Sequence, residues 1–148
     1  KDHPLFLAKE SEFQRHCQNN IRNFSYLDRN IQCILERLGT PCQVSIAYFD
    51  SDGYLIQLYC NETYRDFFQK RGIVSRSVWT EETSGFNAVT EGFRCDRPFI
   101  SCGTSHSHPA LKDLTIYFSP VHFEQIEAAT PTTVSYTHLR AHETKANL

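Results

Sequence analysis

The sequence predicts an α+β domain in which a largely antiparallel sheet packs against helices on one side. Two observations lead to this prediction. Positions 5–38 contain neither Gly nor Pro and carry apolar residues at helical spacing. Short runs rich in β-branched and aromatic residues follow, separated by turn signals. A helix, a hairpin, further helices and further strands in this order are typical of an α+β domain, and 148 residues can bury a core as one domain.

Residues 1–40 are predicted to be helical. Their apolar side chains recur mostly three or four positions apart, as on one face of a helix: Phe13, Cys17, Ile21, Phe24, Ile31, Ile34, Leu35 and Leu38. Gly39 and Pro41 end the helical region. One helix of about 30 residues would be about 45 Å long, so part of its apolar stripe would pack against a second copy of the chain. Two shorter helices broken near residues 19–20, both packed on one core, explain the pattern equally well.

A β-hairpin is predicted for residues 43–59. Two strands of alternating side chains, 43–49 and 54–59, flank the turn signal Asp50-Ser51-Asp52-Gly53. An Asp-x-Asp-Gly string is also typical of the start of a calcium-binding loop. The later ligand positions and the closing Glu of such a loop are missing, so the turn is favoured.

Four further elements are predicted from local patterns. They are a helix over 62–70 with Asn61 as its N-cap, a helix over 85–93 capped by Ser84, and strands over 99–103 and 114–123.

Residues 124–148 are interpreted as a linker remnant followed by a non-native tail. From about Val134 the string Ser-Tyr-Thr-His-Leu-Arg-Ala-His-Glu-Thr resembles translated sequencing-adapter DNA and has no apolar periodicity. We therefore exclude this tail from the fold prediction. The alternative is a genuine short C-terminal helix.

Composition excludes several classes of function. The formal net charge is −2 at pH 7, so no basic face is expected for direct contact with nucleic acid. No apolar run approaches the ~20 residues of a membrane span, and the first residues do not form a secretory signal.

The six cysteines are scattered and are interpreted as free thiols in the cytoplasm. The chain begins at Lys1 rather than Met, which suggests a fragment.

The most informative motif lies in residues 79–89. It reads Trp-x-Glu-x-x-x-Gly-Phe-Asn-Ala and is followed by several smaller matches: Arg97-Pro98, Gly103, His106 and Ser119-Pro120. In these motifs and their order, residues 31–123 resemble the GAF sensor domain of sigma-54-dependent transcriptional activators of the acetoin/glycerol type. Phe86 stands where that family has Thr, so the class of ligand is expected to differ. The family also closes its sheet with a further strand after Pro120, which residues 124–133 do not provide, so the resemblance implies an incomplete sheet with an unpaired edge.

This resemblance implies a function in regulation. Residues 41–123 would form an incomplete GAF-like sensor domain for a small-molecule effector, and residues 1–40 a helix through which two copies dimerise. The domain would signal to ATPase and DNA-binding modules that this chain does not contain. The resemblance implies no enzymatic activity, no metal and no other cofactor.

Six residues are predicted to contact the effector in a pocket beneath the segment 79–87. They are Trp79, Phe86, Asn87, Phe99, Cys102 and Tyr48. Each has a structural alternative, because the aromatic rings could belong to the core and Asn87 could cap a helix.

Two other functions are kept as alternatives. Cys102, His106 and His108 offer thiolate and imidazole ligands for a redox or metal sensor, although their spacing matches no standard motif. Cys60, Cys95 or Cys102 beside a histidine could act as the nucleophile of a small thiol-dependent reductase.

Overall fold

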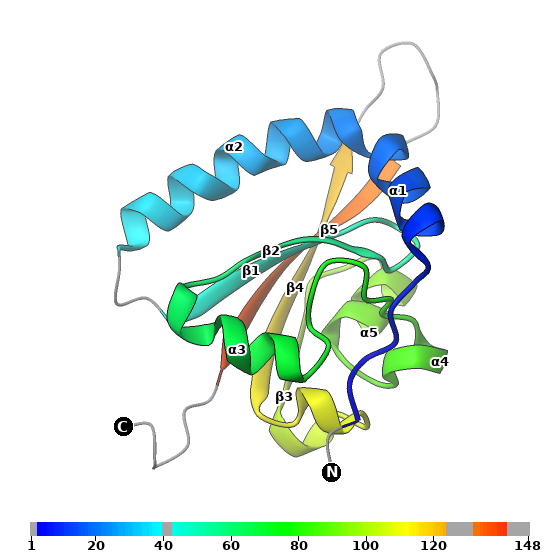
Figure 1. Cartoon of the computed structure of the whole chain (residues 1–148), viewed down its shortest axis with the longest axis vertical. Helices are drawn as coiled ribbons and strands as arrows, with labels where there is room; N and C mark the ends of the chain where they lie inside the picture. The colour runs from blue at the N-terminus through cyan, green and yellow to red at the C-terminus, as the bar shows by residue number, and fades with distance from the viewer. Residues whose placement is uncertain (1–2, 40–42, 124–131, 142–148) are drawn as a thin grey trace.

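The computed structural model describes residues 3–39, 43–123 and 132–141. Its elements in chain order are α1 (Glu10–Asn19), α2 (Ile21–Leu38), β1 (Val44–Phe49), β2 (Leu55–Tyr59), α3 (Glu62–Lys70), α4 (Glu81–Ser84), α5 (Ala88–Cys95), β3 (Phe99–Cys102), η1 (Gly103–Ser105), η2 (Pro109–Leu111), β4 (Leu114–Phe123) and β5 (Thr132–Ala141). The strands form one sheet in the order β2-β1-β5-β4-β3, and every pair is antiparallel (Figure 1). The predicted α+β class, with an antiparallel sheet and flanking helices, is therefore confirmed.

Helices cover both faces of the sheet, so the prediction of helices on one side only is wrong. Ala47 and Phe49 of β1 belong to a core that includes side chains from α3 and α5. Ile46 and Tyr48 belong to a second core with side chains from α1 and α2. Successive residues of a strand point to opposite faces, and in β1 both sets are buried because each face has its own helical layer.

The N-terminal region forms two helices rather than one, as the second of the two alternatives predicted. Asn20 interrupts the helical backbone at φ −108° and ψ 5°, and its side-chain amide donates to the carbonyl of His16 at 2.7 Å. In α2, Leu27 and Ile31 are buried against the sheet, whereas Ile34 and Leu38 are 38% and 47% exposed. Among the described residues, no helix is both long and apolar enough to cross a membrane.

The turn between β1 and β2 confirms the turn interpretation of residues 50–53. Asp50 Oδ1 accepts hydrogen bonds from the backbone N–H groups of Asp52 and Tyr54, at 3.1 and 2.9 Å. Gly53 has φ 85°, and a Cβ atom there would lie 2.7 Å from the carbonyl oxygen of Trp79. Only glycine fits this close approach without strain.

The helix predicted over 85–93 begins three residues later than expected. Ser84 is the last residue of α4, Gly85 takes a left-handed φ of 69°, and Asn87 is the N-cap of α5. Gly85 breaks the helical path, so Ser84 cannot cap the helix that follows. Asn61 caps α3 as predicted, through a bond from the Thr63 N–H to its side chain at 3.1 Å.

The C-terminal segment forms a strand that the sequence analysis did not predict. Residues 132–141 make β5, which pairs with β1 along 44–49 and with β4 along 114–123. The expectation of a sheet without its closing strand, and the alternative of a C-terminal helix, are both corrected by this pairing. Backbone hydrogen bonds to two long neighbours need no apolar periodicity, and Thr, Val and Tyr favour strands. The non-native origin of the tail stays a prediction, and positions 124–131 and 142–148 lie outside the described residues.

Candidate functional site

Asn87 organises the loop that carries the sequence motif. Its side-chain oxygen accepts from the N–H groups of Val89 and Thr90, at 2.9 and 3.2 Å. Its amide nitrogen donates to Ser84 Oγ at 3.0 Å and to the carbonyl of Gly85 at 3.2 Å. The side chain is fully buried. Asn87 therefore uses its amide group to cap α5 and hold the α4–α5 connection.

Trp79 is a core residue of the same face. Only 1% of it is exposed, its ring meets Phe49 edge-on at 5.0 Å between centroids, and its indole N–H donates to Ser77 Oγ at 2.9 Å. Trp79 therefore lies in the core, which is the structural alternative to a role in ligand binding.

The other four predicted ligand residues do not converge on one place. Phe86 and Phe99 come together edge-on with centroids 6.2 Å apart, and Phe86 is partly exposed. Cys102 is exposed at the end of β3. Tyr48 lies on the opposite face of the sheet, in the core beneath α1 and α2. The structure thus places Phe86 beside Phe99 and separates Tyr48 from both, although the sequence prediction put all three in one pocket.

His106 belongs to a buried hydrogen-bonded network rather than to a metal centre. Ser101 Oγ accepts from the N–H of Ala88 at 2.7 Å and lies 2.7 Å from His106 Nε2. His106 Nδ1 lies 2.7 Å from the carbonyl of Leu111. A neutral ring that donates from Nδ1 and accepts at Nε2 satisfies both contacts. The network ties the first turn of α5 to β3 and η2.

This network removes the basis for a metal sensor built on Cys102, His106 and His108. His106 uses both ring nitrogens, and His108 Nδ1 accepts from the N–H of Ala110 at 3.1 Å. In the part of the chain that the structure describes, these three side chains do not form a metal-ligand group. Sequence spacing alone could not reveal that the imidazoles were already engaged.

The alternative of a thiol-dependent reductase also lacks support, because burial disfavours the thiolate form of Cys60. Cys17, Cys33, Cys60, Cys95 and Cys102 are free cysteines. Burial raises the pKa of the Cys60 thiol, which lowers its thiolate fraction at neutral pH. A nucleophile needs the opposite shift.

Two hollows on the described surface bear on the predicted effector site. One lies between β2 and α3 and has a volume of about 280 Å³. It is lined by Gln57, Leu58, Cys60, Arg65, Phe68, Gln69, Ile73, Val74 and Ser75. The other follows the edge strand β3, is mainly apolar and is lined by Pro98, Phe99, Ile100, Tyr117 and Phe118. Of the six predicted ligand residues, Phe99 alone lines either hollow.

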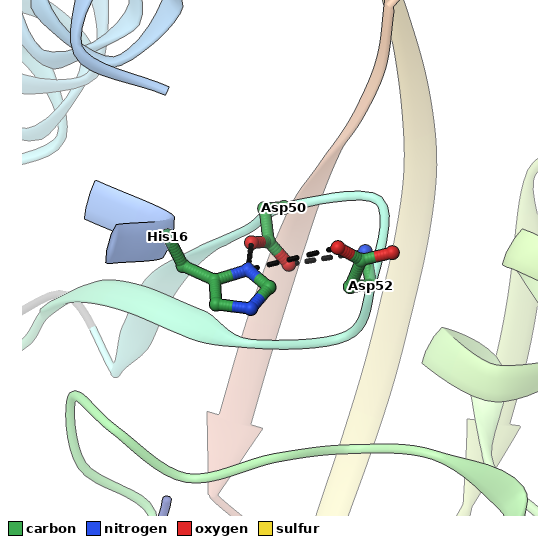
Figure 2. Close-up of side chains that lie close together, drawn as sticks. All are labelled: His16, Asp50 and Asp52. Carbon is green, nitrogen blue, oxygen red and sulfur yellow. Dashed lines mark hydrogen bonds and ion pairs between the residues drawn. The ribbon is translucent and has the colours of Figure 1, made fainter. Parts of the chain in front are cut away.

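A third feature joins α1 to the β1–β2 turn. His16 Nδ1 lies 2.7 Å from Asp50 Oδ2 and 3.6 Å from Asp52 Oδ2 (Figure 2). Among the described residues, this is the one group of three whose ligand atoms all lie within 4.8 Å of one another. The turn signal at 50–53 was visible in the sequence, but nothing there indicated His16, which is 34 positions before Asp50.

Comparison with known proteins defines the fold. No protein-family model and no curated protein sequence matches this chain. Among solved structures, a chain in the crystal structure of the E. coli DhaR(N)–DhaL complex is similar, with a TM-score of 0.82 and 11% sequence identity. The similarity covers 100% of this chain and 49% of that one, so this chain spans about half of its neighbour's length. At this identity the likeness shows the fold alone, an antiparallel sheet with flanking helices, in agreement with the predicted α+β class.

Proposed function

We propose that this chain is a small-molecule-sensing regulatory domain of a sigma-54-dependent transcription regulator. The GAF resemblance of residues 31–123 supports this class, as does the fold shared with a chain of the DhaR(N)–DhaL complex. The ATPase and DNA-binding modules of the regulator would lie outside this chain. The domain works in the cytoplasm and acts by binding rather than by catalysis.

The hollow between β2 and α3 is the observation on which the effector site rests. Its volume of about 280 Å³ is at the lower end of the range for ligand pockets, which suits a molecule of a few heavy atoms. Leu58, Phe68 and Ile73 contribute apolar walls, and Gln57 and Gln69 bring amide groups. Polar atoms contribute more of this lining than apolar atoms do, which suits a ligand rich in hydroxyl or carbonyl oxygens.

Arg65 gives this hollow its chemical preference. Its Nε donates to Glu62 Oε2 at 3.2 Å, which positions the guanidinium beside the cavity. Guanidinium and amide N–H groups bind hydroxyl and carbonyl oxygens. We therefore expect a small polyol or hydroxyketone, in line with the acetoin/glycerol type of activator that the sequence resembles.

Dimerisation through the N-terminal helices is the second part of the proposal. Ile34 and Leu38 belong to the apolar stripe of α2 but keep 38% and 47% of their surface exposed. A second copy of α2 would cover them. Light scattering of the Leu38→Glu variant tests this: a dimeric wild type and a monomeric variant support it. The exposed Ile100 on β3 supplies the control Ile100→Glu, which should stay dimeric.

Isothermal titration with acetoin and with glycerol tests the effector site. We expect one of them to bind the wild type, and Arg65→Ala to weaken that binding at least tenfold. Arg94→Ala is the matched control, because Arg94 also pairs with a glutamate three residues earlier on an exposed helix face. Equal affinity of the wild type and Arg65→Ala would remove this hollow as the effector site, and loss of binding in Phe86→Ala instead would favour the sequence-predicted position.

A further inference from the structure

We propose that His16, Asp50 and Asp52 form a binding site for a divalent transition-metal ion that links α1 to the β1–β2 turn. The three side chains come from two segments far apart in the sequence and point toward one another (Figure 2). This site lies on the α1 side of the sheet, away from the hollow between β2 and α3, and does not depend on the proposed effector function.

The distances are close to those of a coordination shell. Nitrogen and carboxylate ligands lie about 2.0–2.2 Å from Zn²⁺, so two ligands at a tetrahedral ion are about 3.3–3.6 Å apart. His16 Nδ1 and Asp52 Oδ2 are already 3.6 Å apart. The 2.7 Å between His16 Nδ1 and Asp50 Oδ2 is a hydrogen bond, and it would lengthen by about 0.6–0.9 Å around an ion.

Two of the ligands are held in place by contacts outside the set. The His16 ring stacks on Tyr54 with centroids 3.6 Å apart and planes 15° apart. The Tyr54 hydroxyl in turn donates to Glu12 Oε1 at 2.5 Å. Asp50 uses Oδ1 for the turn, so that Oδ2 faces the histidine. Such outer contacts are what orient the ligands of established metal sites.

The charge balance of the cluster favours a cation. Asp50 is 2% exposed, and the Asp52 carboxylate lies close to the same imidazole. Among the described residues no Lys or Arg forms an ion pair with Asp50, and its ion-pair partner is His16. A divalent ion would balance both aspartate carboxylates at once.

The ligand set also indicates which ions fit. One imidazole and two carboxylates suit Mn²⁺ or Zn²⁺, whereas Mg²⁺ and Ca²⁺ prefer sites made entirely of oxygen. Three protein ligands leave at least one position for water. The Asp52 side chain is 69% exposed and gives the ion a path from solvent.

Titration of the EDTA-treated, dialysed full chain with Mn²⁺, followed by electron paramagnetic resonance, tests the site. Mn²⁺ is chosen because the free thiols of the chain bind it weakly. We expect one saturable site that a tenfold excess of Mg²⁺ does not empty. Asp52→Asn should weaken Mn²⁺ binding at least tenfold and leave the metal-free melting temperature unchanged, since its side chain is largely exposed. Asp66→Asn, which removes an exposed carboxylate on α3, is the matched control and should bind as the wild type does.

Three outcomes would overturn the site. The first is the absence of saturable Mn²⁺ binding by the wild type up to 1 mM. The second is an Asp52→Asn variant that binds Mn²⁺ as tightly as the wild type. The third is a folded His16→Gln variant that binds Mn²⁺ as tightly as the wild type. Such a result would mean that the imidazole is not a ligand and that only the aspartates of the turn bind the ion. Because acetoin and glycerol are absent from this titration, its result does not depend on the effector site.

Discussion

Two buried polar networks lie on opposite faces of the sheet, and they are built differently. On the α5 face, Asn87 hydrogen-bonds to backbone groups and to Ser84, while Ser101 contacts His106 and accepts from the N–H of Ala88. On the α1 face, the buried Asp50 carboxylate faces His16 and the exposed Asp52. In the first network, protein groups satisfy the polar side chains of Asn87, Ser101 and His106. The second reaches solvent at Asp52, and among the described residues its buried carboxylate has no Lys or Arg partner.

This difference separates a network that holds the fold together from one that leaves a carboxylate open to solvent. The motif that makes the chain resemble a GAF domain belongs largely to the closed network, where Asn87 and His106 connect α5 to its surroundings. The open network has no sequence motif, and its histidine comes from a different helix. A recognisable motif can therefore mark residues that stabilise the fold. The clustered titratable side chains, His16, Asp50 and Asp52, lie outside this motif.

Substitution of Asn87 should have the largest effect on stability. Asn87→Ala removes both cap acceptors and leaves Ser84 Oγ and the Gly85 carbonyl without its amide. We expect a loss of about 3 kcal/mol in the free energy of unfolding, measured by urea denaturation. Asn61→Ala, at the more exposed cap of α3, is the control and should cost about 1 kcal/mol. Equal losses of unfolding free energy in the two variants would show that Asn87 stabilises the protein no more than an ordinary helix cap does.

The Tyr48 hydroxyl should show the reverse effect on the α1 face. It is buried and has no hydrogen-bond partner among the described residues, and burial is the main reason that its pKa is raised. Tyr48→Phe should leave the free energy of unfolding unchanged or raise it by about 1 kcal/mol. In the same urea experiment, Tyr59→Phe should lower it by about 1 kcal/mol, because the Tyr59 hydroxyl donates to Asp28. A clear loss in Tyr48→Phe would mean that its hydroxyl has a partner in solution.

The smallest expected effect is a pH dependence from His108. Burial lowers the pKa of its imidazole from the ordinary 6.5. The folded state therefore favours the neutral ring, and its stability contribution is lost as the pH falls below 6.5 toward the folded-state pKa. His108→Asn keeps an acceptor for the Ala110 N–H and should show a smaller loss between pH 7.5 and pH 5. The same slope in both proteins would exclude this contribution from His108.

Much of the fold could be predicted from local patterns, and the failures have physical causes. The strand over 43–49, the Asp50 turn and the Asn61 cap were predicted from local signals, and each appears where expected, although both faces of the strand are buried. β5 was missed because a strand paired on both sides can form from backbone hydrogen bonds and strand propensity without an apolar stripe.

The site was less predictable than the fold. Trp79 and Asn87 were found by resemblance, but their burial and hydrogen bonds emerge only when α5 packs on the sheet. His16 meets Asp50 across 34 positions, a contact that no spacing rule in one sequence can indicate. Gln57 and Arg65 likewise line one hollow only after β2 and α3 have folded together.

The most direct test of the sensor proposal is amide chemical-shift mapping of the ¹⁵N-labelled chain during titration with acetoin or glycerol. The proposal predicts that the shifted amides cluster on β2, α3 and the adjoining residues 73–75. Shifts centred on Phe86 and Phe99, or the absence of saturable shifts with both compounds, would contradict an effector site between β2 and α3.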